Sequence, residues 1–118
     1  MFDFQKLEVY KKAKELHIHL KSISKEKSLN KIIADQLFRA SLSIPLNIAE
    51  GSGRFTPKDR RNFFIISRSS VFECVAILDS IGDENFISTE RYNEALKAAD
   101  EISRILYTMI KNLDKKSE

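Results

Sequence analysis

Glycine and proline are scarce in this sequence, with three glycines and two prolines among 118 residues. All-β sandwiches and barrels need many tight turns, and tight turns rely on these two residues. Five such residues cannot separate the roughly seven strands of a sandwich, so we exclude an all-β fold. The scarcity of breaks favours long helices. The length is that of one domain, which we expect to span residues 1–118.

Apolar residues recur every three or four positions in four segments, as they do along amphipathic helices. These segments cover about 5–23, 29–50, 57–80 and 89–113. Short polar breaks separate them, near 24–28, 51–56 and 82–88. Connections this short place consecutive helices side by side and antiparallel. The sequence therefore predicts an all-α fold, an antiparallel up-and-down four-helix bundle.

Local signals mark where these helices begin and end. Ser28 and Ser88 are the expected N-caps of the second and fourth helices. Thr56 followed by Pro57 is a strong start signal for the third helix. Gly51 is the expected left-handed cap that ends the second helix.

The second and third helices each carry an additional apolar stripe. In the second helix it consists of Phe38, Leu42, Leu46 and Ala49. A helix with two apolar faces is either central or packs on a further partner, and one small bundle cannot bury both faces. The sequence therefore predicts a homo-oligomer.

The residue types that carry enzyme chemistry do not form a site. His17 and His19, the only histidines, point about 200° apart on a helix and cannot share a metal ion. Cys74 falls on an apolar stripe and is expected to be a buried, inert thiol. The sequence lacks the Glu-x-x-His pairs of di-iron bundles. We therefore predict no catalytic residues, no metal site and no cofactor.

Composition also predicts the compartment. A single cysteine excludes a disulfide framework and favours a reducing environment. The first residues lack the apolar stretch of a signal peptide, and no run of 18 apolar residues occurs. We expect a cytoplasmic protein that makes no contact with a membrane.

Positive charge is concentrated at the start of the third helix, although the net charge is only +3. Cations oppose the helix dipole at an N-terminus, whereas the free N–H groups there bind anions. Both features favour a surface for the phosphate backbone of a nucleic acid. A solvated charged face, or salt bridges to the acidic segment 69–101, is the alternative. The predicted nucleic-acid-binding residues are Arg54, Lys58, Arg60, Arg61 and Arg68.

The stretch from Phe38 to Arg54 reads FRASLSIPLNIAEGSGR. It resembles the signature of a bacterial family of four-helix-bundle proteins encoded within intervening sequences of large-subunit ribosomal RNA genes. The opening DFQKLEVYKKA (3–13) and the ending EISRILY (101–107) resemble the first and last helices of that family. The resemblance therefore covers nearly the whole chain.

This resemblance implies a ring-shaped homopentamer without catalytic residues. A relative of the family, the accessory variability protein of diversity-generating retroelements, is a basic pentamer that binds nucleic acid and a reverse transcriptase. The implied partners are therefore further copies of the chain, RNA or DNA, and a protein such as a reverse transcriptase.

Several family motif positions have expected structural roles. Pro45 is expected to kink the second helix without ending it, and Asn47 to satisfy carbonyls that Pro45 frees. Glu50 and Arg54 are placed to pair across the following turn. The motif positions taken from the family are Arg39, Pro45, Asn47, Glu50 and Gly51.

Two functions fit these observations. The first is a non-enzymatic oligomer that binds RNA, or an RNA-containing complex, through basic surfaces. The second is a structural or protein-interaction scaffold that makes no direct contact with nucleic acid. Only the first predicts RNA binding with a steep dependence on salt.

Overall fold

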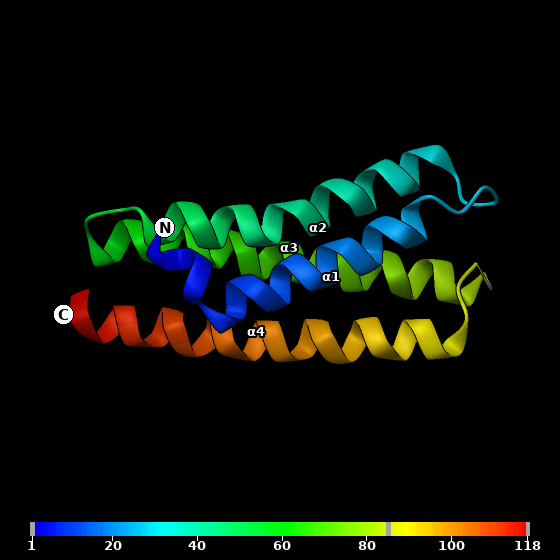
Figure 1. The fold of residues 1–118 in the computed structure, drawn as a ribbon. Coiled ribbons are helices and arrows are strands. Elements are labelled where there is room, and N and C mark those ends of the chain that lie inside the picture. The colour runs from blue at the N-terminus through cyan, green and yellow to red at the C-terminus, as the bar shows by residue number, and fades with distance from the viewer. Residues whose placement is uncertain (1, 85, 118) are drawn as a thin grey trace.

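The computed structural model describes residues 2–84 and 86–117, and all regular structure within them is helical. A short 3₁₀-helix precedes four long α-helices: η1 (Asp3–Lys6), α1 (Glu8–Ser24), α2 (Lys31–Ser52), α3 (Pro57–Asp83) and α4 (Thr89–Ser117). Consecutive helices run in opposite directions along the bundle (Figure 1). The predicted four-helix bundle is therefore confirmed.

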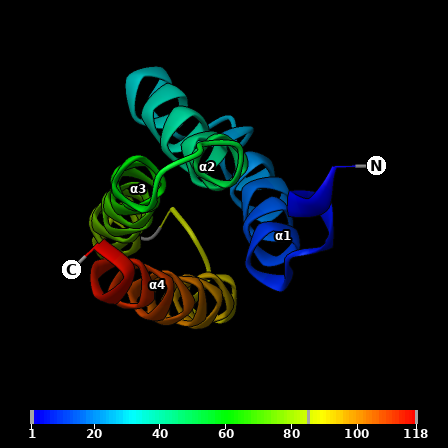
Figure 2. The same cartoon turned by 90° about the vertical axis from the view of Figure 1, so that its left-hand side faces the viewer.

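The bundle is elongated, with a long dimension of 48 Å. Viewed along its length, the helices follow one another around the bundle in chain order (Figure 2). The α2–α3 connection lies at the same end as the N-terminal segment and the end of α4, and we call this the α2–α3 end (Figure 1). The other two connections lie at the opposite end. Residues of the N-terminal segment, the α2–α3 connection and the end of α4 therefore lie at one end of the bundle although they are far apart in sequence.

Each helix buries one apolar stripe in a common core. Leu20 of α1, Ile44 of α2, Leu78 of α3 and Ile102 of α4 are fully buried, and each such side chain contributes roughly 1.5–3 kcal/mol. The predicted stripe of α1 is buried throughout its length: Val9, Ala13, Leu16, Leu20 and Ile23. The spacing of apolar residues therefore identified the buried face of α1, whereas in α3 Ile66, from a predicted stripe, is 47% exposed.

The start of α2 differs from the prediction that Ser28 caps it. Asn30 is the N-cap, and its Oδ1 accepts hydrogen bonds from the N–H groups of Ile32 (2.8 Å) and Ile33 (3.4 Å). Leu29 is buried against the core, and its N–H donates to the carbonyl of Glu26 (3.1 Å). Burial of Leu29 keeps the chain in the connection beyond Ser28, so the helix begins later.

The prediction that Gly51 ends α2 as a left-handed cap is wrong. Gly51 is buried inside the last turn, and Gly53 is the C-cap with a right-handed φ of −88°. A Cβ atom on Gly51 would lie 2.7 Å from Cε1 of Phe64 and 3.0 Å from Cβ of Phe63. Gly51 is therefore needed for the close approach of α2 and α3.

The predicted starts of α3 and α4 are confirmed. Oγ1 of Thr56 accepts a hydrogen bond from the N–H of Asp59 (3.1 Å), and Oγ of Ser88 accepts one from the N–H of Arg91 (3.2 Å). The third helix continues to Asp83, beyond the predicted end at 80. The additional turn places Ile81 in the core, where it is fully buried.

Helix α2 passes through Pro45 without ending. Its N-terminal half rises away from the line of its C-terminal half (Figure 1), which agrees with the expected kink. Nδ2 of Asn47 donates to the carbonyl of Ser43 (2.8 Å) and contacts Oγ of the same residue (2.9 Å). Asn47 therefore contacts a different carbonyl from that of Ser41, which Pro45 frees.

Candidate functional site

Two of the five predicted cations line one groove between α3 and α4. Arg61 and Arg68 lie two turns apart on α3 and both face α4. The groove has a volume of about 420 Å³, within the range of roughly 300–1,000 Å³ that is usual for ligand sites. We call it the α3–α4 groove. Its lining residues are Arg61, Ile65, Arg68, Ser69, Phe72, Tyr107, Ile110, Lys111 and Asp114.

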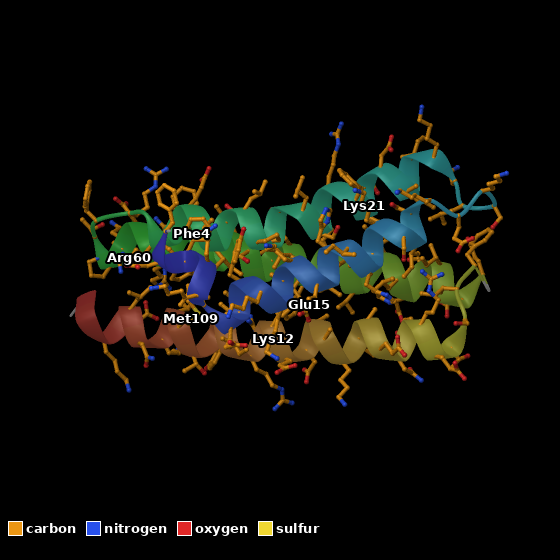
Figure 3. The ribbon with its side chains drawn as sticks, viewed as in Figure 1. Phe4, Lys12, Glu15, Lys21, Arg60 and Met109 are labelled. Carbon is orange, nitrogen blue, oxygen red and sulfur yellow. The ribbon has the colours of Figure 1, made fainter. Side chains whose placement is uncertain are left out.

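The other three predicted cations lie around the α2–α3 end. Arg54 and Lys58 are exposed. Nε of Arg60 donates to the carbonyl of Arg54 (2.7 Å), and its side chain lies beside Phe4 and Met109 (Figure 3). The five cations therefore do not form a single face: three lie around the α2–α3 end, and Arg61 and Arg68 line the α3–α4 groove.

Glu50 and Gly51 of the family motif lie in the last turn of α2, next to this end, whereas Arg39 and Pro45 lie near the middle of the helix. Arg39 and Glu50 are exposed on α2. The guanidinium carbon of Arg54 lies 4.5 Å from the ring centroid of Phe63. Within residues 2–84 and 86–117 no ion pair joins Glu50 to Arg54, in contrast to the expectation. A cation–π contact takes the place of that pair.

Arg61 forms an ion pair across the groove. Its Nε donates to a carboxylate oxygen of Asp114 on α4, and each side chain is 36% exposed. A pair this exposed contributes between about 0 and 1 kcal/mol to stability. The carboxylate compensates part of the positive charge of the groove and holds Arg61 toward α4.

Arg68 is held against the wall of the groove. Its Nε donates to the carbonyl of Ser103 (3.2 Å). Its guanidinium carbon lies 4.9 Å from the ring centroid of Phe72 and 5.4 Å from that of Tyr107. Its two terminal nitrogens have no hydrogen-bond partner in the part of the chain that the structure describes. Arg68 therefore presents oriented donors to the solvent.

The sequence did not predict the two exposed aromatic residues of the groove or its third cation. Phe72 and Tyr107 are 56% and 51% exposed, and Nζ of Lys111 lies 5.6 Å from the Tyr107 ring centroid. Phe72 follows Arg68 by four residues, and Lys111 follows Tyr107 by four. That spacing signals a pair on one helix face, but only the packing of α3 on α4 brings the two pairs together.

The groove combines charge with exposed rings. Three cations face one carboxylate, and two aromatic side chains lie between them. Cations attract phosphate, and aromatic rings stack with nucleobases. The arrangement suits a nucleic acid bound without sequence selection.

A second surface feature lies on the outer side of α2 and α3. Leu46 and Ile66 are 54% and 47% exposed. Oγ of Ser43 and Oγ of Ser70 hydrogen-bond across the two helices at 2.8 Å, and Leu46 and Ile66 follow about one turn along from this bridge. We call this the α2–α3 outer face. It contains part of the additional apolar stripe predicted for α2.

The histidines and the cysteine lie apart from both surfaces. Nδ1 of His17 lies 2.8 Å from Oγ of Ser41, and burial, aided by the charge of Lys21, lowers the pKa of His17. His19 faces α4 in a different groove. Burial raises the pKa of the Cys74 thiol to about 12. The described residues contain no group of histidine, cysteine and carboxylate side chains suited to a metal ion.

None of the helices in the described part of the chain has the length and hydropathy needed to cross a membrane.

Comparisons with known proteins concern the family and the fold. The family model described as 23S rRNA-intervening sequence protein matches residues 5–108. A crystal structure of a protein of unknown function, from the S23 ribosomal protein family of Bacteroides thetaiotaomicron, superimposes with a TM-score of 0.83. The likeness covers 87% of this chain and 98% of that one. At 23% sequence identity it shows a shared fold and nothing about function. No curated protein matches the chain.

Proposed function

The chain belongs to the 23S rRNA-intervening sequence protein family, and from this premise we propose that it is a non-enzymatic protein that binds RNA through basic surfaces. The observation that carries the proposal is the α3–α4 groove. There Arg61, Arg68 and Lys111 face solvent together with two exposed aromatic rings.

Electrostatics support RNA as the ligand. Phosphate contacts by arginine and lysine dominate the affinity of most nucleic-acid-binding proteins. Such contacts position the ligand without reading its sequence. Arg54, Lys58 and Arg60 continue the positive field around the α2–α3 end. We infer that RNA lies over this end of the bundle and enters the groove.

Self-assembly forms the second part of the proposal. The α2–α3 outer face exposes Leu46 and Ile66, and an apolar face of this kind is suited to a second copy of the chain. The family resemblance indicates five copies. A ring would repeat the modest charge of one subunit, and simultaneous contacts raise the overall affinity. We place this assembly in the cytoplasm.

The direct test compares RNA binding by matched variants. In the first, Arg60 and Arg61 are both replaced by alanine. The control replaces Lys25 and Lys27, which are exposed in the α1–α2 connection at the opposite end. Both variants lose two positive charges, so they share the same net charge. In filter binding at low salt, the first should bind RNA more weakly than the control.

A scaffold without RNA contact is the second candidate, and the α2–α3 outer face favours it. This surface suits a protein partner as well as a second copy. If the chain shows no affinity for RNA or DNA at ~50 mM salt, the scaffold explains the protein better. If R60A/R61A binds RNA as tightly as the parent, Arg60 and Arg61 do not contribute to RNA binding.

A further inference from the structure

We propose that the α3–α4 groove selects unpaired RNA, because a base stacks on Tyr107 and Phe72 while Arg68 and Lys111 bind the adjoining phosphates. This inference rests on the proposed RNA-binding function and adds the class of RNA. It concerns a site formed only by the pairing of α3 with α4.

The positions of the two rings support stacking. Both rings are about half exposed although they lie within a groove. The Arg68 guanidinium contacts both of them, at 4.9 Å and 5.4 Å from their centroids, and is itself held by the Ser103 carbonyl. Because the guanidinium lies over part of each ring, a base stacks on the exposed part of the rings or displaces the guanidinium toward the adjoining phosphate.

Duplex RNA cannot use these rings. Its bases are stacked on one another, and the deep, narrow major groove of an A-form helix does not admit side chains. An unpaired base offers a free face to an aromatic ring and leaves its phosphate for a neighbouring cation. Duplex RNA is left with the contacts that the cations make to its backbone.

The charge along the groove limits the length of the site. Beyond Phe72 a second cavity of about 320 Å³ continues between the same helices. It is lined by apolar side chains such as Val75 and Leu96, but also by Asp79 and Asp100. Asp100 is paired with Arg104 (3.0 Å), so Asp79 leaves one negative charge there, and this cavity attracts phosphate less than the groove with its three cations does. We infer that the α3–α4 groove holds only a few nucleotides.

The test places a reporter on the stacking surface. The chain has no tryptophan, so Tyr107→Trp supplies a single indole that preserves stacking. A short unstructured RNA should quench its emission, and the same strand in a blunt duplex should not. Tyr107→Leu should weaken binding of the single strand by roughly 5- to 150-fold and leave duplex binding unchanged.

Tyr10 provides a matched control. It also has a lysine four residues later, and Nζ of Lys14 lies 5.4 Å from its ring centroid. It belongs to α1, outside the groove. The indole of Tyr10→Trp should not be quenched by either RNA. Circular dichroism of the Tyr107 variants should retain the helical spectrum, since Tyr107 is half exposed, and the same spectrum is required of Tyr10→Trp before it serves as the control.

Two results would overturn the inference, and they are distinguishable. If single strand and duplex bind Tyr107→Leu and the parent alike, and neither quenches the indole at position 107, the groove binds phosphate alone. The proposed RNA-binding function then stands without base stacking. If no RNA binds the parent at low salt, the proposed function itself is wrong, and this inference falls with it.

Discussion

Arg68 contacts the ring of Phe72, one turn further along α3, and two groups of α4 that lie far from it in sequence, the Ser103 carbonyl and the Tyr107 ring. Lys58, on the first turn of the same helix, is exposed. A planar guanidinium stacks on rings and donates in fixed directions, which an ammonium group does not do. Residues of equal charge within one basic segment therefore have different roles.

His17 makes stability depend on pH. Burial lowers the pKa of this imidazole below its ordinary value of 6.5, so the unfolded chain takes up a proton before the folded chain does. The free energy of unfolding should therefore fall as the pH drops below that ordinary value. His17→Gln removes the titration and should reduce this loss.

Urea unfolding at about pH 7.5 and about pH 5.5, on either side of the ordinary histidine pKa, measures the effect. The parent should lose more stability between these conditions than His17→Gln. Because the carboxylates titrate equally in both proteins, the difference isolates His17. Equal losses in the two proteins would show that the environment of His17 does not affect its protonation.

At the scale of helices, Gly51 controls how closely α2 approaches α3. Gly51→Ala places a methyl group 2.7 Å from the Phe64 ring, and overpacking of this kind costs roughly 1–3 kcal/mol. The better helix propensity of alanine offsets up to about 1 kcal/mol. We expect a net loss of stability, measured by urea unfolding.

Gly53→Ala is the control for that substitution. Its Cβ would meet only ordinary contacts, the nearest at 3.6 Å from the Glu50 carbonyl oxygen, and its φ of −88° suits any residue. The stability should change by less than about 0.5 kcal/mol. A Gly51→Ala protein as stable as Gly53→Ala would contradict the role assigned to Gly51.

The helix ends show which features of the fold could be predicted from the sequence. Thr56 and Ser88 were identified as caps because a cap depends on a few neighbouring residues. Gly51 was misassigned because its role depends on Phe64, which belongs to another helix. The start of α2 was misplaced for a similar reason, since tertiary burial of Leu29 lengthens the connection.

The candidate site follows the same rule: features within one helix could be predicted from the sequence, and contacts between helices could not. Arg61 and Arg68 could be placed on one face because their spacing of seven residues is that of two helical turns. Tyr107 and Lys111 could not be added to them from sequence, because the apolar stripe of α4 has two flanks and the sequence does not show which of them lies against α3. Helix faces follow from periodicity, whereas the residues that meet across two helices follow from packing.

At the scale of the whole molecule, the α2–α3 outer face predicts self-association. Light scattering at micromolar concentration should give a mass several times the 13.6 kDa of one chain, and the family resemblance indicates five copies. Leu46→Glu combined with Ile66→Glu should yield a folded monomer, because both side chains are about half exposed in one chain.

A monomer mass for the parent protein would contradict this prediction. A dimer or a tetramer would contradict only the number of copies. Ile18→Glu is a suitable control, because Ile18 is 65% exposed on α1, away from the α2–α3 outer face. It should leave the mass unchanged.

The salt dependence of RNA binding tests the central claim most directly. The logarithm of the association constant should fall linearly with the logarithm of salt concentration, by about 0.7 per phosphate neutralised in a single strand and about 0.9 in a duplex. R60A/R61A should flatten this slope by roughly one to two for each subunit engaged, whereas K25A/K27A should retain the slope of the parent. A slope near zero for the parent, or the same slope for R60A/R61A and the parent, would contradict RNA binding through the cations at the α2–α3 end.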